Sequence, residues 1–154
     1  MTIEVAPASP RAPEALALLR QSDAYFAALY PAESNHLLDV DKLDRPEVSF
    51  LLARRGGQAL GCGALLLRPG EGEGEGELKR LFVVPEARGL GVGREVLLAL
   101  EALARGGGVR VLRLETGVAQ PESLGLYRDH GYAERGPFGG YGPDPLSVFM
   151  ERIL

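Results

Sequence analysis

The 154-residue chain has a single cysteine, Cys62, and no run of apolar residues that approaches the length of a membrane-spanning helix, roughly 20 residues. A lone cysteine excludes an internal disulfide, and the apolar residues around Cys62 favour a buried packing residue over an activated nucleophile. The first ten residues also lack the basic and then apolar layout of a signal peptide. The sequence therefore predicts a cytoplasmic protein that does not contact a membrane.

Blocks of basic residues are absent too, because the charged residues are dispersed and sum to a net charge of -4. The chain lacks the basic patch that binds a nucleic-acid backbone, so any anionic ligand must be bound by a few local residues. What is present is an ordinary globular composition, 45% hydrophobic and 25% charged. A chain of this length buries roughly 70% of its unfolded surface, which predicts a single domain over residues 1–154.

Strand and helix patterns are mixed along the chain and predict an α/β (α+β) fold in three layers. Residues 31–46 are irregular and suit a loop or short helix that overhangs a site, and the alternating GEGEGEGE of residues 70–77 predicts a solvated hairpin loop. The expected strands are residues 3–6, 48–54, 58–68, 78–84, 109–115 and 146–153, and the expected helices begin near Pro13 and span 91–105 and 121–130.

The most informative stretch is residues 83–94, a strand that breaks at Pro85 and re-enters as a helix. Three alternating glycines lie in that turn: Gly89, Gly91 and Gly93. Glycines let a ligand approach the backbone, and the first amides of a helix carry the positive end of its dipole. Arg88 and Arg94 flank the turn and could add charge-assisted hydrogen bonds. The turn therefore predicts a cradle for a pyrophosphate.

Two other phosphate-binding patterns compete with this interpretation. The loop of nucleotide triphosphatases needs lysine after its last glycine, whereas arginine follows Gly93. A dinucleotide-binding turn gains support from Glu115, which ends the next strand where that fold places its ribose-binding acid. However, its first glycine should follow the strand directly, and four residues separate Val84 from Gly89. A nucleotide-binding protein, which would bind NAD or ATP, is thus a rival interpretation.

The spacing R-x-x-G-x-G at Arg88, Gly91 and Gly93 resembles the coenzyme A turn of GCN5-related N-acetyltransferases, the GNAT family. SLGLYRDHGY, at residues 123–132, is similar to the family's later helix, and both elements occur in the family's order. The segments GCGAL (61–65), LETG (114–117) and the final FGGYGPDPLSVFMERIL resemble a bacterial subgroup of undefined substrate. The resemblance implies the GNAT fold, a central mixed and mostly antiparallel β-sheet flanked by helices on both faces.

The resemblance also implies an activity, the transfer of an acetyl group from acetyl-CoA to a primary amine by direct attack. Neither a metal nor a covalent enzyme intermediate is expected. An acidic chain without an evident peptide groove favours a small-molecule amine over protein amines, which stay open as an alternative. A non-catalytic module that binds or senses acyl-CoA is a second alternative. Many members of the family form dimers, so a homodimer is compatible with the sequence.

Carried over by position, the resemblance implies the residues that bind the cofactor. The backbone of Leu81, Phe82 and Val83 would pair with the pantetheine arm as an additional strand does. Amides of the turn would hold the pyrophosphate, and Gln120 stands where the family often has asparagine. The implied cofactor residues beyond the strand are Arg88, Gly89, Leu90, Gly91, Val92, Gly93, Arg94, Gln120 and Tyr127.

Acetyl transfer requires a neutral amine, a stabilised oxyanion and a proton for the thiolate that leaves. Tyr127 matches the family's tyrosine near the coenzyme A sulfur and is the candidate acid. Glu77 stands where lysine-acetylating relatives carry a general base, although it could equally be a solvated end of the glycine-glutamate loop. A backbone amide of Leu81 or Phe82 is the candidate oxyanion partner. The candidate acceptor-binding residues are Glu33, His36, Phe138 and Tyr141, of which the last two could instead form a rigid connector.

Overall fold

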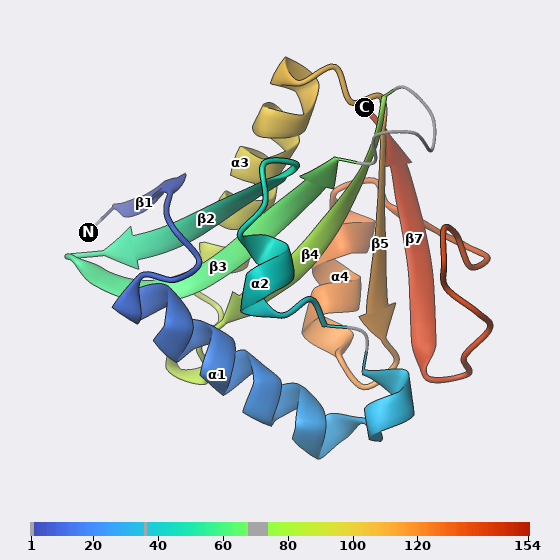
Figure 1. Ribbon diagram of the computed structural model, residues 1–154, viewed down its shortest axis with the longest axis horizontal. Coiled ribbons are helices and arrows are strands. Elements are labelled where there is room, and N and C mark those ends of the chain that lie inside the picture. Colours follow the sequence, from blue (N-terminus) through green and yellow to red (C-terminus); the bar gives the residue numbers. More distant parts are fainter. Residues whose placement is uncertain (1, 36, 68–73) are drawn as a thin grey trace.

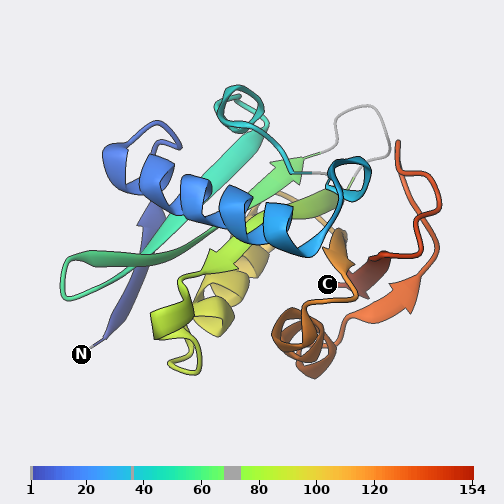
Figure 2. The same ribbon diagram turned by 90° about the horizontal axis from the view of Figure 1, so that it is seen from below.

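The structure of the chain is a computed structural model that describes residues 2–35, 37–67 and 74–154. Seven strands form one sheet in the order β1-β2-β3-β4-β5-β7-β6, with helices on both faces (Figures 1 and 2). Only β4 and β5 pair in parallel among the described strands, and every other neighbouring pair is antiparallel. The mixed, mostly antiparallel sheet implied by the resemblance is therefore confirmed.

The helices and strands agree with the expected ones to within about three residues at their ends. The strands are β1 (Ile3–Pro7), β2 (Val48–Arg55), β3 (Gln58–Leu67), β4 (Glu75–Val83), β5 (Val111–Gly117), β6 (Ala133–Arg135) and β7 (Ser147–Ile153). The helices are α1 (Pro13–Leu29), α2 (Val40–Leu43), α3 (Val92–Gly106) and α4 (Pro121–Asp129), with short 3-10 turns η1 (Ala32–Ser34) and η2 (Pro85–Ala87). The short strand β6 is not among the strands expected from the sequence.

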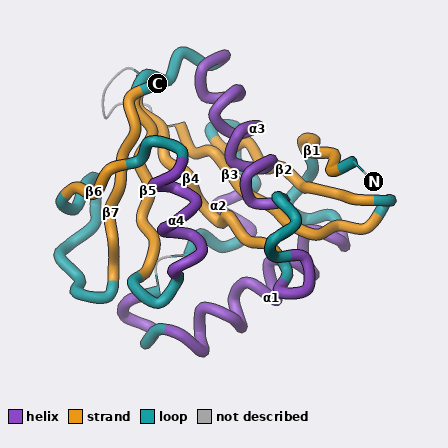
Figure 3. The backbone as a smooth tube through the Cα atoms, turned by 180° about the vertical axis from the view of Figure 1, so that it is seen from behind, coloured by secondary structure: helices purple, strands orange, loops and turns teal. Residues whose placement is uncertain are grey.

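The two faces of the sheet are covered by different helices. α1 and α2 lie on one face, and α3 and α4 lie on the other (Figures 2 and 3). α3 packs through a buried stripe in which Val92, Val96 and Leu100 recur every four residues, as an amphipathic helix requires. This packing fixes the start of α3, and with it the glycine turn, at the end of β4.

The start of β4 corrects the prediction of a solvated loop over residues 70–77. Residues 70–73 lie outside the described part of the chain, but Glu75, Gly76 and Glu77 belong to the strand. A Cβ on Gly76 would meet the side chains of Leu65 and Leu112 at 3.2 and 3.3 Å, so only glycine fits this core position without displacing them. Alternating glycine and glutamate is thus a strand pattern here, with glycine facing the core.

β4 and β5 run side by side only over their first halves. Their ladder extends from Glu75 opposite Val111 to Leu78 opposite Leu114 in the described structure. Beyond Leu78 the two strands diverge, and α4 lies behind the gap (Figure 1). The second half of β4 is therefore paired with β3 on one edge and leaves its other edge facing away from any described strand.

Close packing between β3 and α3 makes Gly63 a test of the core. A Cβ at this position would lie 2.8 Å from Val96 Cγ1 and 2.9 Å from Leu100 Cδ1. Gly63→Ala should therefore lower the free energy of unfolding by about 1–3 kcal/mol through overpacking. Urea denaturation measures this loss, and Gly125→Ala on α4, where a Cβ meets nothing within 4 Å, is the matched control. Equal midpoints for the Gly63 variant and the wild type would contradict the packing described.

Candidate active site

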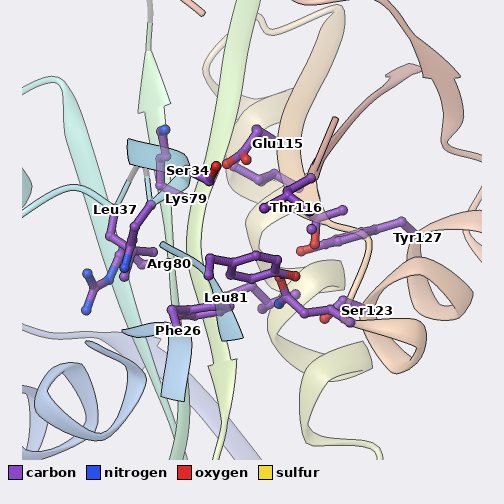
Figure 4. Close-up of a pocket in the computed structure, with 16 residues that line it drawn as sticks. Phe26, Ser34, Leu37, Lys79, Arg80, Leu81, Glu115, Thr116, Ser123 and Tyr127 are labelled. Atoms are coloured by element: carbon purple, nitrogen blue, oxygen red, sulfur yellow. The ribbon is translucent and has the colours of Figure 1, made fainter. Parts of the chain in front are cut away.

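Two cavities meet where β4 and β5 diverge. The larger, with a volume of about 290 Å³, lies between β4, the glycine turn and α4. The smaller, of about 60 Å³, lies between β4, β5, α1 and the segment after α1, and Figure 4 shows the residues around it. Both cavities are lined by Phe26, Leu81, Gln120 and Ser123. The shared lining makes them two ends of one site.

The glycine turn forms one wall of the larger cavity. Gly89 and Gly91 have φ angles of +84° and +86°, in the left-handed region that glycine adopts at little cost. A Cβ on either would meet nothing within 4 Å, so their backbone borders open space rather than packed side chains. α3 begins directly after Gly91, and the amides of its first turn have no partner within the helix. The turn offers these amides and the helix dipole to an anion.

Two arginines stand at the rim of the same cavity. The Arg88 guanidinium lies over the Tyr25 ring, 4.7 Å from its centroid, and Arg94 is exposed with its Nη1 3.8 Å from Glu95. Both side chains line the larger cavity, whereas Leu90 between them is exposed and does not line it. Two cations beside free amides fit a ligand with more than one phosphate. The residues present therefore fit the pyrophosphate of coenzyme A.

The floor of the larger cavity is the second half of β4. Leu81, Phe82 and Val83 all line it, and the Phe82 ring lies 6.1 Å from that of Tyr25. Because β5 has diverged at this level, the strand edge on that side can accept an extended ligand through main-chain hydrogen bonds. The strand thus offers a surface suited to a pantetheine arm.

Tyr127 on α4 points its hydroxyl into the smaller cavity (Figure 4). Burial, and secondarily the Glu115 carboxylate, raises the pKa of Tyr127, so the phenol keeps its proton near neutral pH. Its ring contacts that of Tyr132 edge-on at 5.6 Å, and the Tyr132 hydroxyl donates a 2.8 Å hydrogen bond to buried Glu101. The ring of Tyr127 is therefore fixed by its contact with Tyr132, and its hydroxyl is a protonated hydrogen-bond donor at the cavity wall.

Glu77 is buried rather than solvated, with 1% of its surface exposed, so the solvated alternative is wrong. Its Oε2 lies 2.9 Å from Lys79 Nζ and accepts a 2.6 Å hydrogen bond from the Tyr141 hydroxyl. Lys79 lines the smaller cavity, but Glu77 lines neither cavity. The carboxylate is therefore separated from the cavity by its own ion pair, and its role as a base stays a prediction.

A different carboxylate, that of Glu115 on β5, borders the smaller cavity. Its Oε2 accepts a 2.7 Å hydrogen bond from the Ser147 hydroxyl on β7, and Figure 4 shows the side chain at the edge of the pocket. From the sequence alone, Glu115 is a candidate only as a ribose-binding acid. The sequence feature that could have indicated a role for Glu115 in this cavity is its position near the end of a strand, 12 residues before Tyr127.

The candidate acceptor residues do not gather in one place. Glu33 is exposed and lines neither cavity, although Ser34 and Asn35 beside it line the smaller one. His36 lies outside the described residues. Phe138 is buried against Tyr141, with ring centroids 5.1 Å apart, and the two stand behind Lys79 rather than in the cavity lining.

Gln120 links α4 to α1 between the two cavities. It is buried, and its Oε1 accepts a 3.0 Å hydrogen bond from the Tyr30 hydroxyl, which in turn accepts one from the Ala119 amide. Gln120 lines both cavities, as a residue at their junction does. The hydrogen bonds fix this junction although α1 and α4 are distant in the sequence.

The described residues contain no group of three or more His, Cys, Asp or Glu side chains that could hold a metal ion. In the same part of the chain, no helix has the length and apolar character needed to cross a membrane.

Comparison with known proteins identifies the family. Residues 15–132 match the acetyltransferase (GNAT) family. The chain is 51% identical over 152 residues to a protein named IAA acetyltransferase from Azospirillum brasilense, and the match covers 99% of this chain and 98% of that protein. A crystal structure from Klebsiella pneumoniae, assigned as an acyl-CoA N-acyltransferase, is 38% identical with a TM-score of 0.87, and the match covers 99% of this chain and 98% of that one.

A more distant structure shares the fold. The PaiA N-acetyltransferase of Thermoplasma acidophilum, crystallised in complex with coenzyme A, is 19% identical over 100% of both chains with a TM-score of 0.75. The family match covers most of this chain, and the Klebsiella pneumoniae structure shares its fold over nearly the whole of both chains. The chain belongs to the GNAT family and is an N-acetyltransferase.

Proposed function

We propose that this acetyltransferase moves the acetyl group of acetyl-CoA to a small primary amine, which attacks the thioester directly. The observation that carries the proposal is the junction of the two cavities at Leu81, Gln120 and Ser123, beside Tyr127. Acetyl-CoA occupies the larger cavity, with its pyrophosphate on the glycine turn and its pantetheine arm along residues 81–83. The thioester then lies at the junction, and the amine enters through the smaller cavity.

Each chemical requirement has a residue near the junction. The amine nitrogen first bonds to the acetyl carbon, which gives a tetrahedral oxyanion that a backbone amide of Leu81 or Phe82 stabilises. The carbonyl then re-forms as the carbon–sulfur bond breaks and the coenzyme A thiolate leaves. Glu115 receives the proton that the amine loses, directly or through water. Tyr127, which burial keeps protonated, gives its proton to the departing thiolate.

A small acceptor is supported by two observations. The smaller cavity, of about 60 Å³ against about 290 Å³ for the larger one, is lined by side chains from α1, β4, β5 and α4. The relative at 51% identity is named for a small molecule, IAA, rather than for a protein. A protein amine would have to present its side chain through the same narrow space.

Thiol release across an acceptor panel tests the proposal. Calorimetry first measures acetyl-CoA, NAD and ATP binding, and release is then followed with IAA, amino acids, polyamines, aminoglycosides and short peptides. We expect binding of acetyl-CoA alone and release that depends on a small amine. Release only with peptides would overturn the small-acceptor proposal, and tight binding without release would favour a non-catalytic acyl-CoA module.

Substitution of Glu115 and of Glu77 distinguishes between the two candidates for the general base. Glu115→Gln should lower kcat by about 30-fold because the cavity loses its proton acceptor, a modest general-base contribution. Glu77→Gln, matched in chemistry, should leave kcat within about threefold because Glu77 lines neither cavity. Steady-state kinetics with the best acceptor measures both. The reverse ranking would return the base role to Glu77.

A further inference from the structure

Arg80 has the most unusual backbone in the described chain. Its φ of +59° makes it the one described residue other than glycine in the left-handed region, which costs roughly 1–3 kcal/mol for a side chain of this kind. Strain of this size persists only where the surroundings impose it. The position of Arg80 in β4 indicates which structural feature requires this strained backbone.

Arg80 lies in a bulge of β4. Between the pairs Cys62 opposite Phe82 and Ala64 opposite Lys79, β3 has one residue and β4 has two, Arg80 and Leu81. A bulge redirects the strand and breaks its ladder locally. This one follows the last pair between β4 and β5 by two residues, so it lies where the strands diverge and the cavities begin. Leu81, the next residue, lines both cavities.

The Arg80 side chain is anchored on the face that α1 covers. Its Nη1 donates to Asp23 Oδ1 at 2.8 Å and to the Leu38 carbonyl at 3.2 Å, and its Nη2 donates to the Leu19 carbonyl at 3.1 Å. Only 3% of the side chain is exposed. Figure 4 places Arg80 on the side of the pocket opposite Tyr127. The guanidinium therefore ties the bulge to α1 and to the chain before α2.

The Arg80 guanidinium does not use all of its hydrogen-bond donors, unlike a side chain whose contacts only stabilise the fold. The Arg80 Nε is buried without a hydrogen-bond partner in the part of the chain that the structure describes. A buried donor of this kind costs about 1–3 kcal/mol. Arg80 thus combines a strained backbone with an unpaired donor, and sites that tolerate such costs are frequently functional.

We infer that Arg80 is a positioning residue, whose anchored guanidinium holds the β4 bulge and thereby the backbone of Leu81 and Phe82 at the junction of the cavities. The inference rests on the proposed acetyl transfer, in which this backbone meets the thioester. Arg80 borders the smaller cavity, but its guanidinium is held by Asp23 and by the Leu38 and Leu19 carbonyls, so its effect on turnover passes through the backbone that it anchors. Loss of the anchor lets the bulge relax, so turnover falls while the glycine turn continues to bind the cofactor.

The test removes the anchor without adding strain. Arg80→Gly keeps a residue that adopts a φ of +59° freely but lacks the guanidinium. We expect kcat to fall by about tenfold and the calorimetric Kd for acetyl-CoA to stay within about twofold. Arg80→Lys, which can still donate to Asp23, should recover part of kcat. Arg54→Ala is the matched control, because Arg54 also pairs with α1, through Glu14 at 2.9 Å, but lines neither cavity.

Amide hydrogen exchange gives a readout that does not require turnover. In Arg80→Gly the amides of residues 80–82 should exchange about tenfold faster, while those of α3 remain unchanged. Should Arg80→Gly fail to fold, Asp23→Asn loosens the same anchor and should move both readouts in the same direction. Wild-type kcat and wild-type exchange in the glycine variant would overturn the inference. If the wild-type protein releases no thiol with any acceptor, the proposed function fails, and the exchange experiment still decides whether Arg80 holds the bulge.

Discussion

Replacement of Gly91 by glutamate should weaken acetyl-CoA binding by about 100-fold or more, since a like charge within roughly 4 Å of a phosphate costs several kcal/mol. Gly91 precedes the first turn of α3 and borders the larger cavity. A carboxylate there would compete with the pyrophosphate for the same amides and repel it. Isothermal titration calorimetry with acetyl-CoA measures the loss.

The effect of charge must be separated from backbone strain, because Gly91 has a φ of +86°. Gly57, in the turn between β2 and β3, has a φ of +82°, and a Cβ at Gly57, as at Gly91, would meet nothing within 4 Å. Gly57→Glu therefore adds the same strain and the same charge away from the cavities, and it should bind acetyl-CoA as the wild type does. Undiminished affinity in a folded Gly91→Glu protein would refute the placement of the cofactor.

The second large effect is expected for Tyr127→Phe, which should lower kcat by about 100-fold as the loss of a general acid does. Phenylalanine keeps the ring contact with Tyr132 and removes only the hydroxyl in the smaller cavity. The Kd for acetyl-CoA should stay within about twofold, because the lost proton acts on the thiolate that leaves. Stopped-flow thiol release with the best acceptor separates the chemical step from binding.

The control for this substitution is Tyr132→Phe. The Tyr132 hydroxyl donates to Glu101, which Arg152 also contacts at 2.7 Å, and Tyr132 lines neither cavity. Loss of this hydroxyl should lower the free energy of unfolding by about 1.5–3 kcal/mol, because its acceptor is a buried carboxylate, but leave the kcat of the folded protein within about threefold. Because burial raises the pKa of Tyr127, wild-type kcat should not decline through loss of this proton up to the ordinary pKa of tyrosine. Unchanged release in Tyr127→Phe would exclude it as the acid.

The sequence was most predictive where local chemistry dictates the backbone. The proline that ends β4, the alternating glycines and the buried stripe of α3 are all local signals, and the structure has the turn and the helix where they predict them. The three-residue strand β6 carries no such signal. It exists because β7 lies beside it, with Ala133 opposite Glu151 and Arg135 opposite Phe149.

The site was harder to predict because burial of charge depends on partners from distant segments. Glu77 is ambiguous in the sequence, and in the structure its buried carboxylate pairs with nearby Lys79 and accepts a hydrogen bond from Tyr141, 64 residues away. Glu115 reaches the cavity because β4 and β5 diverge beyond Leu78, which no local pattern in either strand indicates. The cofactor turn is a local feature of the chain, whereas the acceptor cavity is a tertiary one.

The position of β7 has a consequence for biosynthesis. β7 lies between β5 and β6 in the sheet, although both of those strands precede it in the chain. Until residues 147–153 have been synthesised, β7 does not exist. β5, which contains Glu115, and β6 therefore both lack the strand with which they pair. Ser147, whose hydroxyl donates a hydrogen bond to Glu115, arrives with this strand. The nascent chain can therefore assemble the cofactor turn early, but the acceptor side of the enzyme is completed only when β7 is inserted.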